Sequence, residues 1–406
     1  MLKAVAIEKD PDQNQLNNWW ERVDLNYEDG SLSFANQVVK DISNFESPTY
    51  IYSKARIKDN LKRLHQALED VNIQHQIHYA VKANRHPAIL KTVKDTGYAG
   101  VDVCSPKELE LAIASGFKQN QINYTGTSIS NSDYQLIANY TSIQFNADSL
   151  SVIKQIGERN LFDRIGIRIN PQIGLGYNED LEYAGNGVSK FGIYPDQIKT
   201  AFDLAADYGI IIDTIHFHAG SGYLTAQLDA FELLLKTIRP TIDQYKIKHL
   251  NIGGGLGIMQ SEGDRALDLE RWAKILKAQV GDLKIILEPG DYIVKDAGIL
   301  VGEVTYIEEK AGVQFLGLNL GMNINYEYAY YQMNLEPVPL NLTNGPLEKY
   351  TIAGNINEPI DLMGEGILLP KMKEGDLIAF LNTGGYGAST ASNHCMRGEF
   401  EEVVID

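Results

Sequence analysis

The sequence predicts an α/β protein in which a (β/α)8 TIM barrel is joined to a mainly antiparallel β domain. Short apolar runs alternate with helix-like segments through the middle of the chain, which indicates parallel strands with crossover helices. Eight such units follow one another, and eight is the number that closes a barrel. After about residue 297, strand-like runs follow each other without helices between them, as in an antiparallel sheet.

The eight barrel units are expected in a fixed order along the chain. An open, doubly wound sheet would alternate in the same way, but eight units with a glycine cluster at the seventh favour the barrel. The helix of the second unit has a clear start signal. Ser105 is a plausible N-cap, Pro106 takes the first helical position, and Glu108 stands three residues after the cap. The expected strands are IHYAVKA (77–83), GVDVCS (100–105), INYTG (122–126), SIQFNA (142–147), RIGIRIN (164–170), TIHFHAG (214–220), HLNIGGG (249–255) and KIILEPG (284–290).

The chain is expected to divide into three parts. Residues 1–54 form an N-terminal segment, in which SPTYIYS (47–53) contributes a strand to the β domain. Residues 55–296 form the barrel, and residues 297–406 form the C-terminal β domain. The expected strands of that domain are GILVGEVTYIEE, VQFLGLNL, EKYTIAG, DLIAFLNTG and EEVVID, separated by turn signals such as KEGD.

The composition narrows the functional classes. The chain of 406 residues carries 53 acidic and 36 basic residues, and its net charge of −17 argues against general binding to nucleic acid or to anionic membranes. The first residues are apolar over too short a stretch for a secretory signal, and no apolar run reaches membrane-spanning length. Two cysteines cannot form a disulfide framework or a four-cysteine zinc site, and no metal site is expected. We therefore expect a cytoplasmic protein.

Polar or glycine-rich positions close four of the expected strands, at the end where such barrels carry their chemistry. Lys82 closes the first strand and His218 closes the sixth. The glycine triplet 253–255 closes the seventh strand and Glu288 closes the eighth. Each has an ordinary alternative, namely a lysine that reaches water, a structural histidine, a tight turn and a solvated glutamate. Their joint placement on one rim favours a functional site.

These positions match the chemical parts of pyridoxal 5′-phosphate (PLP). A glycine-rich backbone presents N–H groups to a phosphate, and the loop after the seventh strand of a barrel is a favoured phosphate site. A lysine amine forms a Schiff base with an aldehyde, and a carboxylate keeps a pyridine nitrogen protonated. A histidine ring can stack on the flat cofactor. The sequence therefore predicts that PLP is bound through Lys82.

Further motifs, in one order, identify a family. They are YAVKAN (79–84), VDVCSPKEL (101–109), RIGIRINP (164–171), SKFGI (189–193), HFHAGSG (216–222), NIGGGLGI (251–258), EPGDYIVKDAG (288–298) and NTGGYGAST (382–390). With them the chain resembles the PLP-dependent decarboxylases of the alanine-racemase-like barrel class, above all diaminopimelate decarboxylase and more distantly the ornithine and lysine decarboxylases. The resemblance runs from about Thr49 to the C-terminus, and its specificity comes from the order of the motifs.

The resemblance implies roles for individual residues. Lys82 would carry PLP, His218 would stack on it, and Glu288 would meet the pyridine nitrogen. Asp102 and Arg168 would tune the ring and its surroundings. The phosphate would be held by Ser221, Gly253, Gly254, Gly255 and Tyr386. The resemblance also implies a homodimer with shared active sites, in which the β domain of one chain covers the barrel of the other.

Two departures from the family concern the substrate. The family usually has arginine after EPG, where this chain has Asp291, and a second arginine aligns with Glu327. In relatives that act on diaminopimelate, such arginines hold the distal carboxylate. Two acids in their place predict a changed pocket that favours a lysine- or ornithine-like cationic substrate. The alternative is that both are solvated surface acids or that the local alignment is shifted.

A third departure concerns the proton donor. The family's acid is a cysteine, and Asn357 stands at its place while the neighbouring Glu358 and Asp361 are kept. An amide cannot deliver a proton as a thiol does. Cys395 is a candidate substitute, with the alternative that it is a small buried apolar residue. Arg397 is a candidate contact for a substrate carboxylate.

The expected activity is PLP-dependent decarboxylation of an α-amino acid. Lys82, His218, Glu288 and Cys395 are the expected catalytic residues, and the small-molecule substrate is expected to meet the changed pocket. Two alternatives remain. An amino-acid racemase or epimerase would need two opposed acid–base groups, and a non-catalytic relative would regulate a decarboxylase by binding it. Retention of Lys82, Glu288 and the glycine loops argues against the second alternative.

Overall fold

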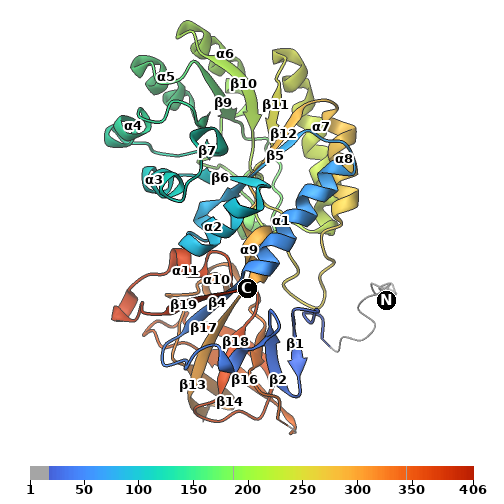
Figure 1. Cartoon of the computed structure of the whole chain (residues 1–406), viewed down its shortest axis with the longest axis vertical. Helices are drawn as coiled ribbons and strands as arrows, with labels where there is room; N and C mark the ends of the chain where they lie inside the picture. Colours follow the sequence, from blue (N-terminus) through green and yellow to red (C-terminus); the bar gives the residue numbers. More distant parts are fainter. Residues whose placement is uncertain (1–17, 186, 344) are drawn as a thin grey trace.

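The computed structural model of the chain describes residues 18–185, 187–343 and 345–406. The short apolar stretch at the N-terminus, within residues 1–17, lies outside this range. A barrel and a β domain lie one above the other, and the segments α9 (Asp291–Val294), α10 (Glu327–Tyr331) and α11 (Gly387–Thr390) lie where the two meet (Figure 1). Within the described residues, no helix combines the length and apolar character needed to cross a membrane.

The predicted barrel is confirmed. Its eight parallel strands close in the order β10-β11-β12-β5-β6-β7-β8-β9, and closure is made where Ile285 pairs with His75. Every expected strand is present, with ends that differ by a few residues. The strands are β5 (His75–Ala80), β6 (Ala99–Val103), β7 (Ile122–Tyr124), β8 (Gln144–Ala147), β9 (Arg164–Arg168), β10 (Ile211–His216), β11 (His249–Asn251) and β12 (Lys284–Leu287).

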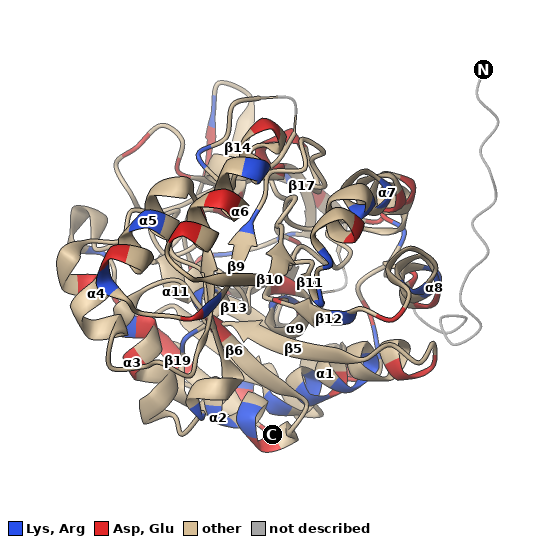
Figure 2. Ribbon diagram, turned by 90° about the horizontal axis from the view of Figure 1, so that it is seen from above, with Lys and Arg blue, Asp and Glu red and all other residues tan. Residues whose placement is uncertain are grey.

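In the part of the chain that the structure describes, eight helices surround the barrel. Figure 2 shows lysines and arginines next to aspartates and glutamates on these outer helices, so both signs of charge share the same faces. The helices are α1 (Lys54–Glu69), α2 (Pro87–Thr96), α3 (Pro106–Ala114), α4 (Asn131–Ile137), α5 (Leu150–Arg159), α6 (Ile198–Asp207), α7 (Leu228–Tyr245) and α8 (Leu269–Val280).

The start of α3 shows how local sequence sets an element. Ser105 caps the helix by accepting a hydrogen bond from the Glu108 backbone N–H (3.2 Å), and Pro106 occupies the first turn, as predicted. The Glu108 carboxylate reaches back to the Cys104 backbone N–H (2.8 Å) rather than to the cap residue. Leu109 and Ala112 are fully buried on the inner face, which packs the helix against the barrel.

The β domain is mainly antiparallel, as predicted. Its sheet has the order β15-β18-β13-β14-β16-β17, and β4 (Thr49–Ser53) pairs antiparallel with β13 and parallel with β19. A three-stranded sheet precedes it, formed by β1 (Leu25–Glu28), β2 (Ser31–Phe34) and β3 (Gln37–Val38). The remaining strands are β13 (Gly298–Lys310), β14 (Val313–Leu318), β15 (Pro337–Pro339), β16 (Leu347–Ala353), β17 (Leu362–Pro370), β18 (Leu377–Phe380) and β19 (Glu401–Ile405).

A loop of the β domain is hydrogen-bonded to the loop that carries Lys82. The Tyr386 backbone N–H donates to the Ala83 carbonyl (2.7 Å), and the Ser389 hydroxyl donates to the carbonyl of Lys82 (2.8 Å). From the barrel side, the Asn84 amide donates to the Gly384 carbonyl (3.0 Å). These bonds fix the β domain at the carboxyl ends of the barrel strands, where the predicted site lies.

Candidate active site

Lys82 lies in the short 3₁₀ turn Val81–Ala83 that follows β5, and it is half-buried. Its positive charge acts on three groups of the barrel rim. Burial is the larger influence on each: it raises the pKa values of Asp102 and Cys104, a rise that Lys82 opposes, and it lowers the pKa of His218, a shift that Lys82 strengthens. The charge of the amine therefore acts on the interior of the rim, and Lys82 stays a predicted site residue.

Glu288 is buried at the end of β12 and is held by three side chains. Its Oε1 accepts hydrogen bonds from the amides of Asn123 and Asn251, each at 2.6 Å, and His216 Nε2 lies 3.2 Å from Oε2. Burial alone would raise the pKa of Glu288, but His216 and the amide bonds outweigh it and hold the pKa well below its usual range. Glu288 is therefore a buried carboxylate that stays ionised.

Asp102 is a second buried carboxyl group close to Glu288. Burial, and next the charge of Glu288, raise the pKa of Asp102 well above its usual value, while Lys82 opposes the shift. The Asn123 amide connects the two groups, since it also donates to Asp102 Oδ1 at 2.7 Å. The pKa values of two carboxyl groups that share one amide donor are thus shifted in opposite directions, a pattern typical of catalytic sites.

His218 sits beyond the end of β10, and its Nδ1 is buried without a hydrogen-bond partner among the described residues. The Tyr183 ring meets it edge-on, with centroids 5.2 Å apart. Burial and then the charges of Lys82 and Arg168 lower the pKa of His218 well below its usual value, so the ring is neutral. Arg168 is itself buried, with Nη1 3.2 Å from Asp148 Oδ1 and its guanidinium 4.4 Å from the Phe191 ring centroid.

The glycine triplet 253–255 forms a cradle in which side chains have no room. A Cβ on Gly254 would lie 2.4 Å from the Glu288 carbonyl oxygen, and one on Gly255 would lie 2.4 Å from that of Gly220. Gly253 and Gly255 also have φ values of +66° and +96°, which side chains disfavour. The N–H groups of Gly254 and Gly255 bond no acceptor in the described part of the chain, so they are available to an anion.

The other predicted phosphate residues flank this cradle. Ser221 is half-buried, and its backbone N–H donates to the Leu181 carbonyl (2.9 Å). Tyr386 adopts the left-handed conformation (φ +59°), which is strained for a tyrosine and points to a positioning constraint. A free N–H cradle, an orphaned histidine nitrogen, a half-buried lysine and an ionised buried carboxylate together fit PLP.

A buried cation, Lys295, lies close to Asp291 and Glu327, the two acids that align with arginines of the family. The sequence analysis did not single out this lysine. Lys295 is 2% exposed, and its Nζ lies 2.5 Å from Glu327 Oε1 and 3.9 Å from Asp291 Oδ2. The side chains of Asp291 and Glu327 are only 12% and 6% exposed, so the alternative of two solvated surface acids is wrong. We call these three residues the distal cluster.

The distal cluster lies beside the rim. Burial raises the pKa values of Tyr386 and Tyr183, and the charge of Asp291 raises them further. Tyr183 is the ring that meets His218 edge-on. Two buried oxygens of the cluster, Asp291 Oδ1 and Glu327 Oε2, have no hydrogen-bond partner within the described residues. Orphaned buried acceptors are costly, which makes them places where a ligand's donor is expected.

The predicted proton-donor segment lies on the surface of the chain. Asn357, Glu358, Cys395 and Arg397 are all exposed, so the alternative of a buried apolar Cys395 is wrong. His394 Nε2 lies 3.2 Å from Glu358 Oε1, beside a surface cleft of about 600 Å³. Asp361 differs: it is buried and accepts hydrogen bonds from the Met322 and Ile356 N–H groups, both at 2.6 Å, which fixes the turn.

Several supporting residues escaped the sequence reading. His216 stands two positions before His218, and residues two apart on a strand share a face. Lys295 stands four positions after Asp291 within the motif EPGDYIVKDAG, and residues four apart lie on the same face of a helix. Asn123 and Asn251 gave no such signal, because asparagine at a strand end is common and their shared acceptor is distant in sequence.

Comparison with known proteins agrees with this geometry. The family described as pyridoxal-dependent decarboxylase, pyridoxal binding domain, matches residues 54–295. The chain belongs to the pyridoxal-dependent decarboxylases. The decarboxylase is 30% identical over 383 residues to diaminopimelate decarboxylase of Methanothermobacter thermautotrophicus, covering 89% of this chain and 87% of the relative.

Two solved structures extend the similarity to the whole architecture. Diaminopimelate decarboxylase from M. jannaschii superposes with a TM-score of 0.84 at 25% identity, covering 94% of this chain and 93% of the other. The Helicobacter pylori enzyme, complexed with L-lysine, gives a TM-score of 0.80 at 27% identity, with coverage of 89% and 92%. The decarboxylase is thus a PLP-dependent amino-acid decarboxylase, as predicted, and PLP is its cofactor. The non-catalytic alternative is wrong.

Proposed function

We propose that the enzyme decarboxylates an α-amino acid whose side chain ends in a positively charged nitrogen, as in lysine or ornithine. The observation that carries the proposal is the pair of orphaned buried oxygens in the distal cluster, Asp291 Oδ1 and Glu327 Oε2. An ammonium group has donors for both oxygens and no acceptor of its own.

The charge count supports the same substrate. Asp291 and Glu327 supply two negative charges when ionised, and Lys295 supplies one positive charge, which leaves the cluster at −1. One distal ammonium would balance this charge. Diaminopimelate carries an amine and a carboxylate at its distal end, so it would bring no net charge and would place an anion near Asp291. A desolvated charge mismatch of this kind opposes binding.

Lys295 orients the acids of the distal cluster without neutralising the net charge of the cluster. Burial would lower the pKa of Lys295, but Asp291 and Glu327 together raise it, so the ammonium stays charged. Its contact with Glu327 Oε1 orients that carboxylate and leaves Oε2 free. Lys295 thereby fixes the direction in which Glu327 can accept a donor from the substrate.

The residues around the cofactor have distinct tasks in the reaction. Lys82 would hold the cofactor aldehyde, the glycine triplet with Ser221 and Tyr386 would hold the phosphate, and His218 would face the ring. When bound, PLP supplies an electron sink for the pair left by the departing CO2. Glu288, kept ionised by His216 and two amides, would accept the pyridine N–H, while the raised pKa of Asp102 disfavours a second negative charge nearby.

The proton that replaces CO2 would come from the surface segment of a second subunit. Cys395 carries a thiol that can deliver a proton, which the amide of Asn357 cannot do. Cys395 is exposed on this chain, so its thiol can face a partner subunit. Glu358 and Arg397 would then border the partner's substrate, and Asp361 would hold their turn in shape. Mixing Lys82→Ala chains with Cys395→Ala chains tests this. A homodimer with shared sites regains activity on mixing, whereas sites built from one chain do not.

Diaminopimelate is the second candidate substrate. Lys295 favours it, because a buried ammonium can replace an arginine as the contact of a distal carboxylate. The similar enzymes from M. thermautotrophicus, M. jannaschii and H. pylori are named diaminopimelate decarboxylases. Against it, Lys295 is already engaged with Glu327 at 2.5 Å.

A decarboxylation screen decides between the two. The holoenzyme is offered lysine, ornithine and diaminopimelate of either hand at matched ionic strength, and CO2 release gives kcat/KM for each. We expect lysine or ornithine to exceed diaminopimelate. A clear preference for diaminopimelate would contradict the cationic pocket while leaving the decarboxylase assignment intact.

A further inference from the structure

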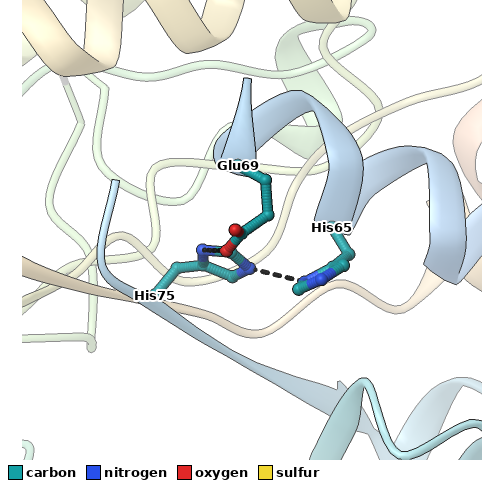
Figure 3. A group of neighbouring side chains, drawn as sticks. All are labelled: His65, Glu69 and His75. Atoms are coloured by element: carbon teal, nitrogen blue, oxygen red, sulfur yellow. Dashed lines mark hydrogen bonds and ion pairs between the residues drawn. The ribbon is translucent and has the colours of Figure 1, made fainter. Parts of the chain in front are cut away.

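A cluster of two histidines and a glutamate lies at the end of the barrel opposite the active site. Figure 3 shows His65 and Glu69 on α1 and His75 at the start of β5, with their polar atoms turned toward one another. One ligand atom from each of the three lies within 4.8 Å of the other two. Lys82 lies seven residues after His75, which is roughly 20 Å along an extended chain, so this cluster is separate from the rim.

Both imidazoles are held in place before any ion arrives. His75 Nδ1 lies 2.8 Å from the Ile73 carbonyl oxygen, an acceptor that makes Nδ1 the protonated nitrogen and leaves the Nε2 lone pair free. His65 stacks on the Tyr98 ring, with centroids 4.7 Å apart. Metal-binding histidines are commonly oriented in this way, by a carbonyl or another partner on the nitrogen away from the ion.

The two rings already meet at a single point. His65 Nδ1 and His75 Nε2 lie 2.8 Å apart and share one proton. Two nitrogens on a tetrahedral zinc ion, each about 2.05 Å from it, lie about 3.3 Å apart. Separating the two nitrogens by about half an ångström more, and turning each ring so that both lone pairs point at the ion, therefore converts the hydrogen bond into a pair of ligands, with the His65 proton moving from Nδ1 to Nε2. No proton is lost and no redox step is involved.

Glu69 supplies the third ligand. It stands one helical turn after His65, so both side chains lie on the same face of α1. Its Oε1 is 3.8 Å from His75 Nδ1, the nitrogen that faces away from His65, so the carboxylate must turn to reach an ion at Nε2. Its side chain is 56% exposed, which leaves room for this movement. Two imidazoles with one carboxylate suit zinc and similar divalent transition metals, whereas magnesium and calcium prefer oxygen ligands alone.

We propose that His65, Glu69 and His75 form a binding site for a divalent transition metal of the zinc type, with water completing the coordination. The ion ties the carboxyl end of α1 to the first residue of β5, the strand that leads to Lys82. Metal at this site stabilises the folded chain by mass action and takes no part in the reaction.

Zinc titration of the PLP-loaded enzyme, purified without a histidine tag and treated with chelator, tests the site. Calorimetry is expected to give one zinc ion per chain, and zinc is expected to raise the melting temperature. His65→Gln should weaken binding by more than the ten- to hundredfold typical of losing an outer-shell partner. Glu69→Gln should weaken it less. Cu2+ in place of zinc should give an electron paramagnetic resonance spectrum with coupling to two imidazole nitrogens.

His249→Gln is the matched control. His249 also stands at the start of a barrel strand beside an acid, with Nδ1 3.8 Å from Asp213 Oδ1. This variant should bind zinc like the unaltered enzyme. The proposal is overturned if zinc binding does not saturate, if it persists unchanged in both His65→Gln and Glu69→Gln, or if the copper spectrum shows a single nitrogen.

Discussion

Asp291→Asn tests the charge of the distal cluster with almost no change in shape. The Asp291 side chain is 12% exposed. Its Oδ1 has no hydrogen-bond partner among the residues that the structure describes, and its Oδ2 lies 3.9 Å from Lys295 Nζ. The substitution takes the cluster from −1 to neutral, with Glu327 and Lys295 still paired. A distal ammonium then loses an ionic partner, while the amide oxygen can still accept a hydrogen bond.

The magnitude follows from the distances. Two unit charges about 4 Å apart interact by about 4 kcal/mol at an effective dielectric constant of 20. Lys295 already takes part of that attraction, and hydrogen bonds to charged groups contribute about 1.5–3 kcal/mol net. Since about 1.4 kcal/mol is a factor of ten, kcat/KM for lysine should fall roughly ten- to hundredfold. Diaminopimelate, whose distal end is neutral overall, should lose less or gain.

The assay compares kcat/KM for lysine and diaminopimelate in the two proteins at one ionic strength, with absorbance confirming that the cofactor stays bound. Glu308→Gln, at an exposed acid on β13 next to Lys310, is the control and should leave the ratio unchanged. If Asp291→Asn lowers both substrates equally, or shifts the preference further toward lysine, the electrostatic reasoning is refuted.

Four further predictions follow from other parts of the site and fold. Borohydride reduction of the holoenzyme should leave a pyridoxyl group on Lys82, and a label on any other lysine would contradict the rim assignment. Glu288→Gln should keep the cofactor but lower turnover on the order of a hundredfold or more, since an amide gives no charge support; near-normal turnover would place the electron sink elsewhere. Burial and the charge of Asp291 raise the pKa of Glu327, although Lys295 opposes the rise. Because protonated Glu327 no longer attracts an ammonium group, KM for lysine should rise as pH falls through that raised pKa. A KM that does not change with pH would argue against contact between Glu327 and the substrate. Arg56 and Arg22 hold the pKa of Asp296 below its usual value despite burial, so this carboxylate stabilises the fold above about pH 4 and its contribution is lost as pH falls further. Asp296→Asn should lower the free energy of unfolding in urea at neutral pH by about 3–5 kcal/mol. The variant should also lose less stability than the unaltered protein as pH falls below about 4.

The sequence by itself determined the architecture and the rim. Strand–helix alternation fixes parallel pairing, and the count of eight fixes closure, so each of the eight barrel strands was found. Lys82, His218 and Glu288 could be placed at one rim because the carboxyl ends of parallel strands meet there. In the β domain, β17 was missed, since Gly364 and Gly366 interrupt its pattern and pairing with β16 supplies what local propensity lacks.

Only the tertiary structure decided the charges. The pKa of Glu288 is held low because Asn123, Asn251 and His216 converge on it from strands distant in sequence. The pKa of Asp102 is raised because Asp102 is buried close to the charge of Glu288. In the sequence, the acids at positions 291 and 327 read as two separate charge inversions. Folding brings both acids to Lys295 and removes all three side chains from water. Protonation and pairing depend on burial and on distances of a few ångströms, and neither quantity is written in the order of residues along the chain.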